Sequence, residues 1–478
     1  MALGKRRREE QMAWVATTDL PKSPGHVFYR KLNEVLAEAE FDHQLEELCR
    51  PYYAQTLGRK SIAPGTYFRM LLIGYFEGIG SQRGIAWRCS DSLSLREFLG
   101  LAATESSPDH SSLTRIRERL PLEIHLTVFR LVLQIAAEKK LLKGKTVAVD
   151  ATTLEANAAM KSIVRRDSGE DWKAYVKSLM QAEGVIDEDD EPTDEEMRRF
   201  DKKRKGKKVS NEDWVSPTDP DSRICRMKDG RTHLAYKAEN VVDLETDMVL
   251  AAEVYHADTA DTATLVDSVM EACVHLQQAG LKVEIEEVVA DKGYHAAATL
   301  ELANALNLRT YIPEPQRKHP RRWTDKPEEY QRAVVNNRRR VQRQKGRQLQ
   351  RKRSEFTERT FAHMCETGGG RRTHLRGLGK VFKRWLMQGA ARNLGIILRK
   401  LFGIGTARGL QGGSWANCGA AELGSLAGLT LRIRCWLHLL VKQYHPATAF
   451  PLRKFDSQLK ITIQSSCRIK AGAFSTGC

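Results

Sequence analysis

Two acidic residues in this sequence end apolar, valine-rich runs. Asp150 ends the run Thr146-Val-Ala-Val, and Asp291 ends the run Val288-Val-Ala. Short apolar runs bounded by polar residues are typical of buried strands, so both carboxylates should lie at the mouth of a sheet. Oxygen ligands held by rigid strands can bind a divalent cation. The pair therefore predicts part of a metal-dependent active site.

A third acid is needed to complete such a site. The candidate is Glu358, because Phe361 and Cys365 follow it at helical spacing and place it at the edge of an apolar helix face. An acid at that edge can reach over a sheet on which the helix packs. The geometry of a helix alone does not decide between Glu358 and its rivals Glu355, Glu366 and Glu314.

Several stretches around these acids resemble the DDE transposases of bacterial insertion sequences, whose catalytic domain is RNase H-like. The matching stretches are Val149-Asp150-Ala-Thr152 with Glu155-Ala-Asn157-Ala, Asp291-Lys-Gly-Tyr294, Glu358-Arg359-Thr-Phe361-Ala, Gly369-Gly-Arg371-Arg372-Thr-His-Leu-Arg376-Gly377, and Ala390-Ala-Arg-Asn393-Leu. Pro108-Asp109-His-Ser-Ser-Leu-Thr-Arg115 is similar to the helical domain that often precedes the catalytic one. The resemblance runs from about Phe28 to Leu398. Three positions around Glu358 depart from the pattern and hold Arg351, Ser354 and Cys365.

The resemblance implies a specific chemistry for the three acids. Asp150, Asp291 and Glu358 would be the catalytic residues and would hold two Mg²⁺ ions, with Mn²⁺ as a possible substitute. Water would cut the phosphodiester at each end of the element, and the released 3′-hydroxyl would attack target DNA. The expected partners are the terminal inverted repeats and the target DNA, bound by a homodimer.

The composition is consistent with a nucleic-acid partner. The 478 residues carry a formal net charge of +17, and a charge of this size favours polyanions because neutralised phosphates release counterions. No apolar run approaches the roughly 20 residues needed to span a bilayer, and the basic start lacks the apolar segment of a secretory signal. We therefore expect a bacterial cytoplasmic protein associated with the nucleoid and not with a membrane.

Six arginines are the candidate DNA contacts. Arg115 and Arg119 are four residues apart in a short predicted helix, so they share a face that could enter a DNA groove, although a solvated basic face has the same spacing. The other four lie around and beyond the third acid: Arg359, Arg371, Arg372 and Arg376. The basic block 315–353 is a further candidate phosphate-contacting surface. We expect its later part to form a helix, which Gly346 should weaken.

The order of elements predicts an α/β protein with an all-α N-terminal domain. After the Asp150 strand come a hairpin (233–243 and 248–255), a helix (262–278), the Asp291 strand, a helix (296–306) and a strand (310–312). This order favours an RNase H-like mixed sheet flanked by helices. We predict a basic tail (1–27), a helical DNA-binding domain (28–140), a catalytic domain (141–400) and a tail (401–478).

A charged insertion, about 156–230, interrupts the predicted catalytic domain. Its acidic stretch 187–196 precedes the basic stretch 202–208, and such blocks bury little apolar surface, so we expect flexible or partly ordered chain. The whole pattern predicts an insertion-sequence transposase. The alternatives are an RNase H-like nuclease without strand transfer and a non-catalytic DNA-binding protein derived from a transposase.

Overall fold

The computed structural model describes residues 24–407 and residue 16, with gaps at 55–57, 59–60, 103, 204–209, 228–229, 318, 320 and 325. The described residues all belong to one compact unit, Met1–Gly412. Nearly all of the predicted tail 1–27, and the predicted tail 401–478 beyond residue 407, lie outside the described residues.

Helices alone make up the described chain before the first strand. They are α1 (Pro24–Glu38), α2 (Phe41–Cys49), η2 (Arg50–Tyr52), α3 (Pro64–Phe76), α4 (Gln82–Asp91), α5 (Leu93–Phe98), α6 (His110–Arg119) and α7 (Leu122–Glu138). Helix α3 begins at a proline, which fits the first helical position, and it is buried along most of its length. Asp109 caps α6 by accepting a hydrogen bond from the Ser111 amide. The predicted helical N-terminal region is confirmed.

A six-stranded mixed sheet follows. Its strands are β1 (Thr146–Glu155), β4 (Arg223–Arg226), β5 (Thr232–Asp243), β6 (Val249–His256), β7 (Glu287–Val289) and β8 (Arg309–Tyr311). Strand β5 pairs antiparallel with β1, β4 and β6, whereas β7 runs parallel to β1 and β8. The predicted hairpin and mixed sheet are confirmed.

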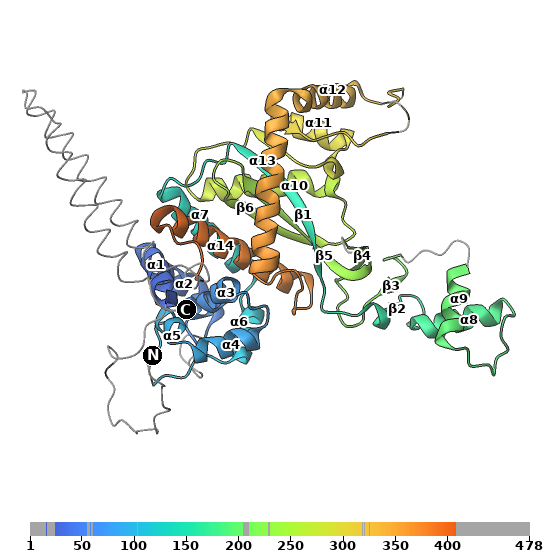
Figure 1. Cartoon of the computed structure of the whole chain (residues 1–478), viewed down its shortest axis with the longest axis horizontal. Helices are drawn as coiled ribbons and strands as arrows, with labels where there is room; N and C mark the ends of the chain where they lie inside the picture. The colour runs from blue at the N-terminus through green and yellow to red at the C-terminus, as the bar shows by residue number, and fades with distance from the viewer. Residues whose placement is uncertain are drawn as a thin grey trace, which may run out of the picture. The chain divides into compact units, whose positions relative to one another are not determined.

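Helices cover the sheet (Figure 1). They are α10 (Asp261–Gln278), α11 (Ala297–Ala305), α12 (Glu328–Gln342), α13 (Gln344–Phe361) and α14 (Leu378–Phe402), with the short η4 (Lys292–Tyr294) and the π-helical η5 (Ala362–Thr367). Helix α13 crosses the sheet, so its buried side reaches the strands that carry the candidate acids.

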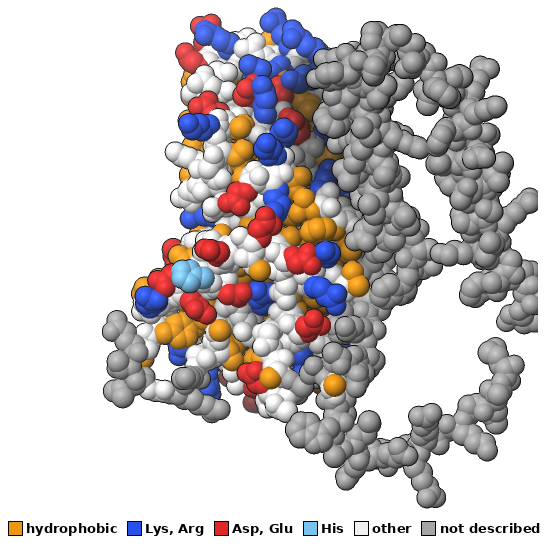
Figure 2. Space-filling view, turned by 90° about the vertical axis from the view of Figure 1, so that its left-hand side faces the viewer, with side chains coloured by type: hydrophobic (Ala, Val, Ile, Leu, Met, Phe, Trp, Pro, Cys, Tyr) orange, Lys and Arg blue, Asp and Glu red, His pale blue; other side chains and the backbone are white. Residues whose placement is uncertain are grey.

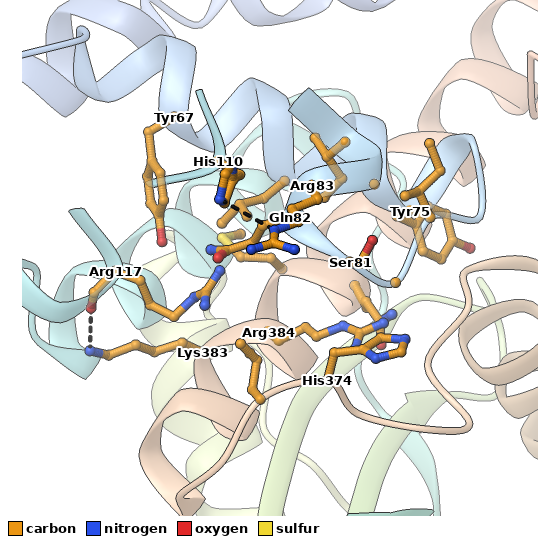
Figure 3. Close-up of a pocket in the computed structure, with 18 of the residues that line it drawn as sticks. Tyr67, Tyr75, Ser81, Gln82, Arg83, His110, Arg117, His374, Lys383 and Arg384 are labelled. Carbon is orange, nitrogen blue, oxygen red and sulfur yellow. Dashed lines mark hydrogen bonds between the residues drawn. The ribbon is translucent and has the colours of Figure 1, made fainter. Parts of the chain in front are cut away.

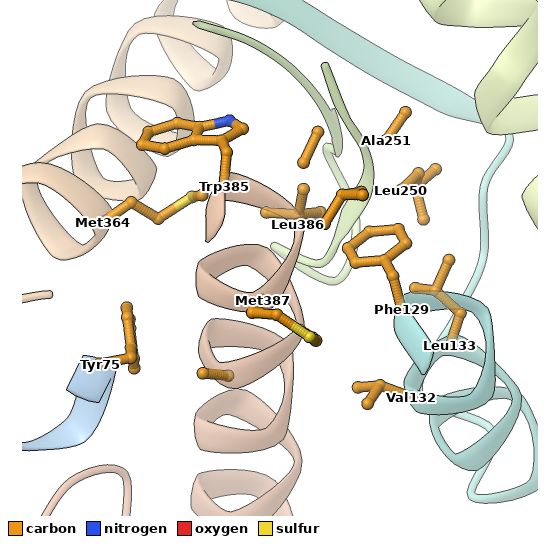
Figure 4. Packing of buried hydrophobic residues seen from close by; sticks show 14 of the residues in the cluster. Tyr75, Phe129, Val132, Leu133, Leu250, Ala251, Met364, Trp385, Leu386 and Met387 are labelled. Carbon is orange, nitrogen blue, oxygen red and sulfur yellow. The ribbon is translucent and has the colours of Figure 1, made fainter. Parts of the chain in front are cut away.

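Helix α14 joins the N-terminal helices and the sheet in one hydrophobic core. It packs against α3 and α7 and also against β6. Figure 4 shows Leu386 and Met387 on α14, with Phe129 of α7 and Leu250 of β6 beside the helix. The side chain of Asn393 bonds both the amide and the carbonyl of Val249, so α14 also satisfies the backbone of β6.

The charged insertion is more ordered than its composition predicts. It contains η3 (Met160–Ser162), β2 (Val164–Arg165), α8 (Trp172–Ala182), α9 (Asp194–Lys203) and β3 (Trp214–Val215). Val176, Met180 and Met197 form a small buried cluster between α8 and α9. The expectation of flexible chain was wrong for these helices, because a few apolar residues at helical spacing suffice to pack them. Residues 204–209 of the basic stretch lie outside the described residues.

The basic block also differs from expectation. The sequence predicted one helix weakened at Gly346, whereas the chain bends at Arg343 between α12 and α13. Gly346 is buried in the first turn of α13, where a Cβ would lie 2.3 Å from the Arg340 carbonyl oxygen and 2.7 Å from that of Val341. The glycine therefore permits the close approach of the two helices at the bend.

No single helix of the described part is both long and apolar enough to cross a bilayer, although α6 and α7, bent at their junction, meet the criterion as a pair.

Candidate active site

Asp150 lies on β1, and Asp291 follows the neighbouring parallel strand β7. Residues 146–148 of β1 pair with residues 287–289 of β7, an offset that would bring Asp291 beside Asp150 if it continued. Asp291 follows β7 and caps η4, where its Oδ1 accepts a hydrogen bond from the Gly293 amide at 2.7 Å. Asp150 lies within β1 and not at its end as predicted, because the strand continues to Glu155, but the charge of Asp291 still acts on it.

The carboxylate of Asp150 faces α13. Its Oδ2 accepts hydrogen bonds from Arg353 Nη1 at 3.0 Å and Thr357 Oγ1 at 2.9 Å, and its Oδ1 accepts one from the Ala151 amide. Burial raises the pKa of Asp150, and the nearby charge of Asp291 raises it further, while Arg353, Thr357 and the Ala151 amide oppose the rise. The two aspartates therefore interact electrostatically, and Arg353 supplies the positive charge between β1 and α13.

A buried polar network supports the strands from the other face of the sheet. Glu239 of β5 is fully buried and accepts hydrogen bonds from Thr264, Ser268 and the Tyr294 hydroxyl. Lys237 Nζ lies 3.1 Å from Glu239 Oε2 and 2.7 Å from Asp261 Oδ1. Because each charge here has a partner, the network can stay buried.

Gly293 lies between this network and the candidate acids. A Cβ on Gly293 would lie 2.9 Å from Asp261 Oδ2 and equally close to Asp291 Oδ1. Tyr294 next to it is buried and anchors η4 to Glu239. The turn that carries Asp291 is therefore fixed by its neighbours.

Glu358 lies on α13 one residue beyond Thr357, with its side chain exposed. Among the described residues, no group of three His, Cys, Asp or Glu side chains is arranged to hold a metal ion. The structure thus brings two of the predicted acids together and leaves Glu358 on the adjacent helix surface.

The rivals for the third acid are all engaged by arginines. Glu355 lies 3.4 Å from Arg359, Glu366 lies 2.7 Å from Arg371, and Glu314 lies 2.7 Å from Arg338. None of the three makes a contact with Asp150 or Asp291 among the hydrogen bonds and ion pairs of the described residues.

Three of the predicted DNA-contacting arginines meet at the far end of β1. The Glu155 amide donates to the Arg371 carbonyl, so this segment continues the sheet edge. Arg372 lies 3.7 Å from Glu155, and Arg376 Nε donates to the Asn157 carbonyl. Of the others, Arg359 pairs with Asp247 at 3.2 Å, Arg119 lies over the Tyr53 ring at 4.8 Å, and Arg115 is exposed on α6.

Sequence reasoning missed the side chains that hold Asp150 in place. Arg353 and Thr357 are four residues apart and so share a helix face, a signal that the surrounding basic residues obscure. The sequence pattern also did not single out Glu239, which lies within a strand. Lys237 and Asn240 lie in the same strand, so no sequence signal set this buried carboxylate apart.

The donor set partly fits a divalent cation. The charge of Asp291 raises the pKa of Asp150, and a bound cation would relieve the repulsion between two such carboxylates. Both oxygens of Asp150 are already hydrogen-bonded, so a cation would compete with Arg353 for this carboxylate.

Comparison with known families covers most of the described chain. A family described as a transposase DDE domain matches residues 143–394, more than half of the sequence. A second family, described as a transposase domain of the DUF772 type, matches residues 18–119. The two matches divide between the mixed sheet with its helices and the N-terminal helices. No curated protein matches this sequence.

Proposed function

Since the chain belongs to the DDE transposase family, with an RNase H-like domain over residues 143–394, we propose that it cuts DNA at the ends of an insertion sequence and joins them to target DNA. The observation that supports the proposal is that Asp150 of β1 and Asp291, which follows the neighbouring parallel strand β7, lie close enough for their charges to interact. We assign the catalytic and metal-binding roles to Asp150, Asp291 and Glu358, with two Mg²⁺ ions, or Mn²⁺, as the cofactor.

The bound ions would activate the attacking oxygen and stabilise the departing 3′ oxygen. The protein's own part is to hold the carboxylates. Thr357 and the Ala151 amide orient Asp150, and the Gly293 amide orients Asp291. The charge of Arg353 opposes the rise in the pKa of Asp150, and a bound cation would take the place of this positive charge. Glu358 would complete the set of acids through a change in its side-chain conformation on α13.

DNA would approach over α13 and the far end of β1. Exposed cations of α12 and the start of α13 include Arg332, Arg338, Arg339, Arg343, Lys345 and Arg347. Figure 2 shows Lys and Arg side chains gathered towards the top of one face, at the height of α12 in Figure 1. We propose that these cations, with Arg115, Arg119, Arg359, Arg371, Arg372 and Arg376, contact phosphates of the terminal repeats and the target, and that a homodimer binds the two ends.

The test is cleavage of duplexes that carry the ends of the element, with Mg²⁺ present. Asp150→Asn keeps the size of the side chain but removes its charge, and we expect cleavage and strand transfer to fall by about 10³-fold, the effect of losing several kcal/mol of stabilisation. Arg198→Gln, an exposed change on α9, is the matched control and should cut normally. Undiminished cutting by Asp150→Asn would refute the assignment.

The same assay separates the alternatives. A nuclease without strand transfer would cut the ends in an Asp150-dependent manner and yield no joined product. A non-catalytic DNA-binding protein would bind the ends, but neither the wild type nor Asp150→Asn would cut them.

A further inference from the structure

A cavity of about 290 Å³ lies between the N-terminal helices and α14 (Figure 3). It is lined by residues of α3, α4, α6 and α7, by the loop before α14 and by α14 itself. Its basic and imidazole side chains are Arg83, His110, Arg117, His125, His374, Lys383 and Arg384. The cavity is separate from the candidate active site, because none of the residues that line it contacts Asp150 or Asp291.

The charge of this cavity is one-sided. Its lining contains no Asp or Glu side chain. Burial and, to a smaller extent, the charge of Arg117 lower the pKa of Arg384 to about 10. Burial also lowers the pKa of Arg117. The pKa of Lys383 is lowered mainly by burial and in addition by the charge of Arg117. Cations that are buried near one another without an acid are unfavourable unless an anion joins them.

The two arginines at the centre have neutral neighbours. Arg384 Nη2 donates to the Gly369 carbonyl at 2.6 Å, and its buried Nη1 has no hydrogen-bond partner among the described residues. Arg117 donates to the side-chain oxygen of Gln82 when that amide is oriented to suit both of its neighbours. Glu118, the acid whose charge acts on Arg117, pairs instead with Lys380 at 3.1 Å. A buried guanidinium nitrogen without a partner points to a missing acceptor.

We propose that this cavity binds a phosphate group through Arg117 and Arg384. Guanidinium groups present paired N–H donors that match the oxygens of a phosphate, and the low polarity of the surrounding walls strengthens such a contact. In Figure 3, Arg117 and Arg384 extend into the cavity from α6 and α14, with His374 beside Arg384. The volume lies near the lower end of ligand pockets, which suits a phosphate with a small attached group.

The cavity lies on the path that DNA would take from the candidate active site. The Thr373 amide donates to the Glu155 carbonyl, and the next residue, His374, lines the cavity. Glu155 is five residues beyond Asp150 on β1, a distance of about 17 Å. One strand of DNA carries a phosphate about every 3.4 Å of axis, so the cavity is at least about five phosphates away. The phosphate can therefore come from bound DNA or from free phosphate.

The first experiment measures thermal unfolding of the full chain, without divalent metal, in sodium phosphate and in sodium chloride of equal ionic strength. We expect phosphate to raise the midpoint by about 1–2 °C, because it binds only the folded state. Gln82→Glu puts a carboxylate beside Arg117 and should abolish the phosphate effect while keeping or raising the midpoint in chloride. Arg384→Gln should also abolish it, whereas Arg198→Gln on α9 should behave as wild type.

The second experiment identifies the source of the phosphate by duplex binding at several salt concentrations. If DNA supplies it, Gln82→Glu weakens binding about tenfold and reduces the salt slope by about one. If free phosphate is the ligand, duplex affinity is unchanged by Gln82→Glu. Equal midpoints of the wild type in phosphate and chloride, or an undiminished phosphate effect in both cavity variants, would overturn the proposal. Cutting is not measured, so failure of the catalytic assignment leaves this result intact.

Discussion

At the scale of single residues, the identity of the third acid is the point most open to experiment. Glu358 and Glu355 lie three residues apart on α13, so they share a region of the helix but differ in their contacts. Glu355 pairs with Arg359, whereas Glu358 follows Thr357, which donates to Asp150. A helix places neighbours about 100° apart, so a change of side-chain conformation can carry Glu358 towards the aspartates.

We therefore expect Glu358→Gln to abolish Mg²⁺-dependent cutting of the element ends, by about 10³-fold. Glu355→Gln is the matched control on the same helix, and it should reduce cutting by less than about tenfold. The measurement is the initial rate of end cleavage for both variants. The reverse ranking would transfer the role to Glu355.

Glu253 on β6 makes a second prediction at this scale. Burial raises its pKa to about 8, with Glu271 and Glu239 raising it and Arg130 lowering it. The unfolded chain releases this proton near pH 4.5, so from there to about pH 8 the folded state binds more protons and stability falls as pH rises. Glu253→Gln should remove this loss and be more stable than wild type at pH 8.5, by about 1–3 kcal/mol.

The measurement is urea unfolding of wild type and Glu253→Gln at pH 5.5, 7 and 8.5. The difference between the two proteins should grow with pH. Parallel stability profiles would show that Glu253 is ionised in the folded state.

Sequence patterns predicted the site residues unevenly, for a physical reason. Asp291 follows β7 as the local pattern predicted, whereas the prediction that Asp150 ends its strand was wrong, because β1 continues to Glu155. The contacts of Arg353 and Thr357 with Asp150 were not predictable, since they join residues about 200 apart in the chain across a helix and a sheet. Local patterns carry no information about which helix face meets which strand.

At the scale of elements, the bend between α12 and α13 sets where Arg353, Thr357 and Glu358 stand over the sheet. The bend depends on Gly346, because a Cβ there would meet the carbonyl oxygens of Arg340 and Val341. Helix propensity alone makes this glycine a weak point of one helix. Its role in the bend depends on the neighbouring helix, which propensity does not describe.

Gly346→Ala should therefore destabilise the fold by about 1–3 kcal/mol, the usual effect of overpacking against backbone. Gly379→Ala in α14 is the control, since a Cβ there would have open space within 4 Å, and alanine should be neutral or stabilising by up to about 1 kcal/mol. Chemical denaturation measures both. Equal stability of the two variants would mean that α12 and α13 do not approach so closely.

Helices and strands with a clear periodic pattern of apolar residues were predictable from the sequence, whereas the helices of the highly charged insertion were not. The hairpin of β5 and β6 and helix α10 follow the sequence pattern closely. Helices α8 and α9 were missed because their charge masks a small apolar face of Val176, Met180 and Met197.

At the scale of the whole molecule, two features bear on how DNA could be bound. One is the excess of positive charge, and the other is the packing of α14. The net charge is +17, and exposed cations are frequent along α12 and the start of α13. Helix α14 packs on both the N-terminal helices and β6, so DNA contacts on one part are held in place by the other. The sequence predicted the charge but not this shared core, because buried residues of α14 contact partners far away in the chain.

Duplex binding should accordingly weaken steeply with salt. We expect affinity for the element ends to fall by about 10³-fold between about 50 and 200 mM salt, as for proteins that contact six or more phosphates. Fluorescence anisotropy with a labelled duplex measures this slope. A flat dependence would mean that few of the exposed arginines reach phosphate.

The central claim is that Asp150 binds the catalytic metal, and exchange of its ligand atom tests this most directly. A thiolate binds Mn²⁺ more readily than the harder Mg²⁺. End cleavage by Asp150→Cys should therefore be lost in Mg²⁺ and partly regained in Mn²⁺, while Asp150→Ser, of similar size, stays inactive with both ions. If Asp150→Cys has the same ratio of Mn²⁺ to Mg²⁺ activity as the wild type, Asp150 is not a metal ligand and the proposed active site is wrong.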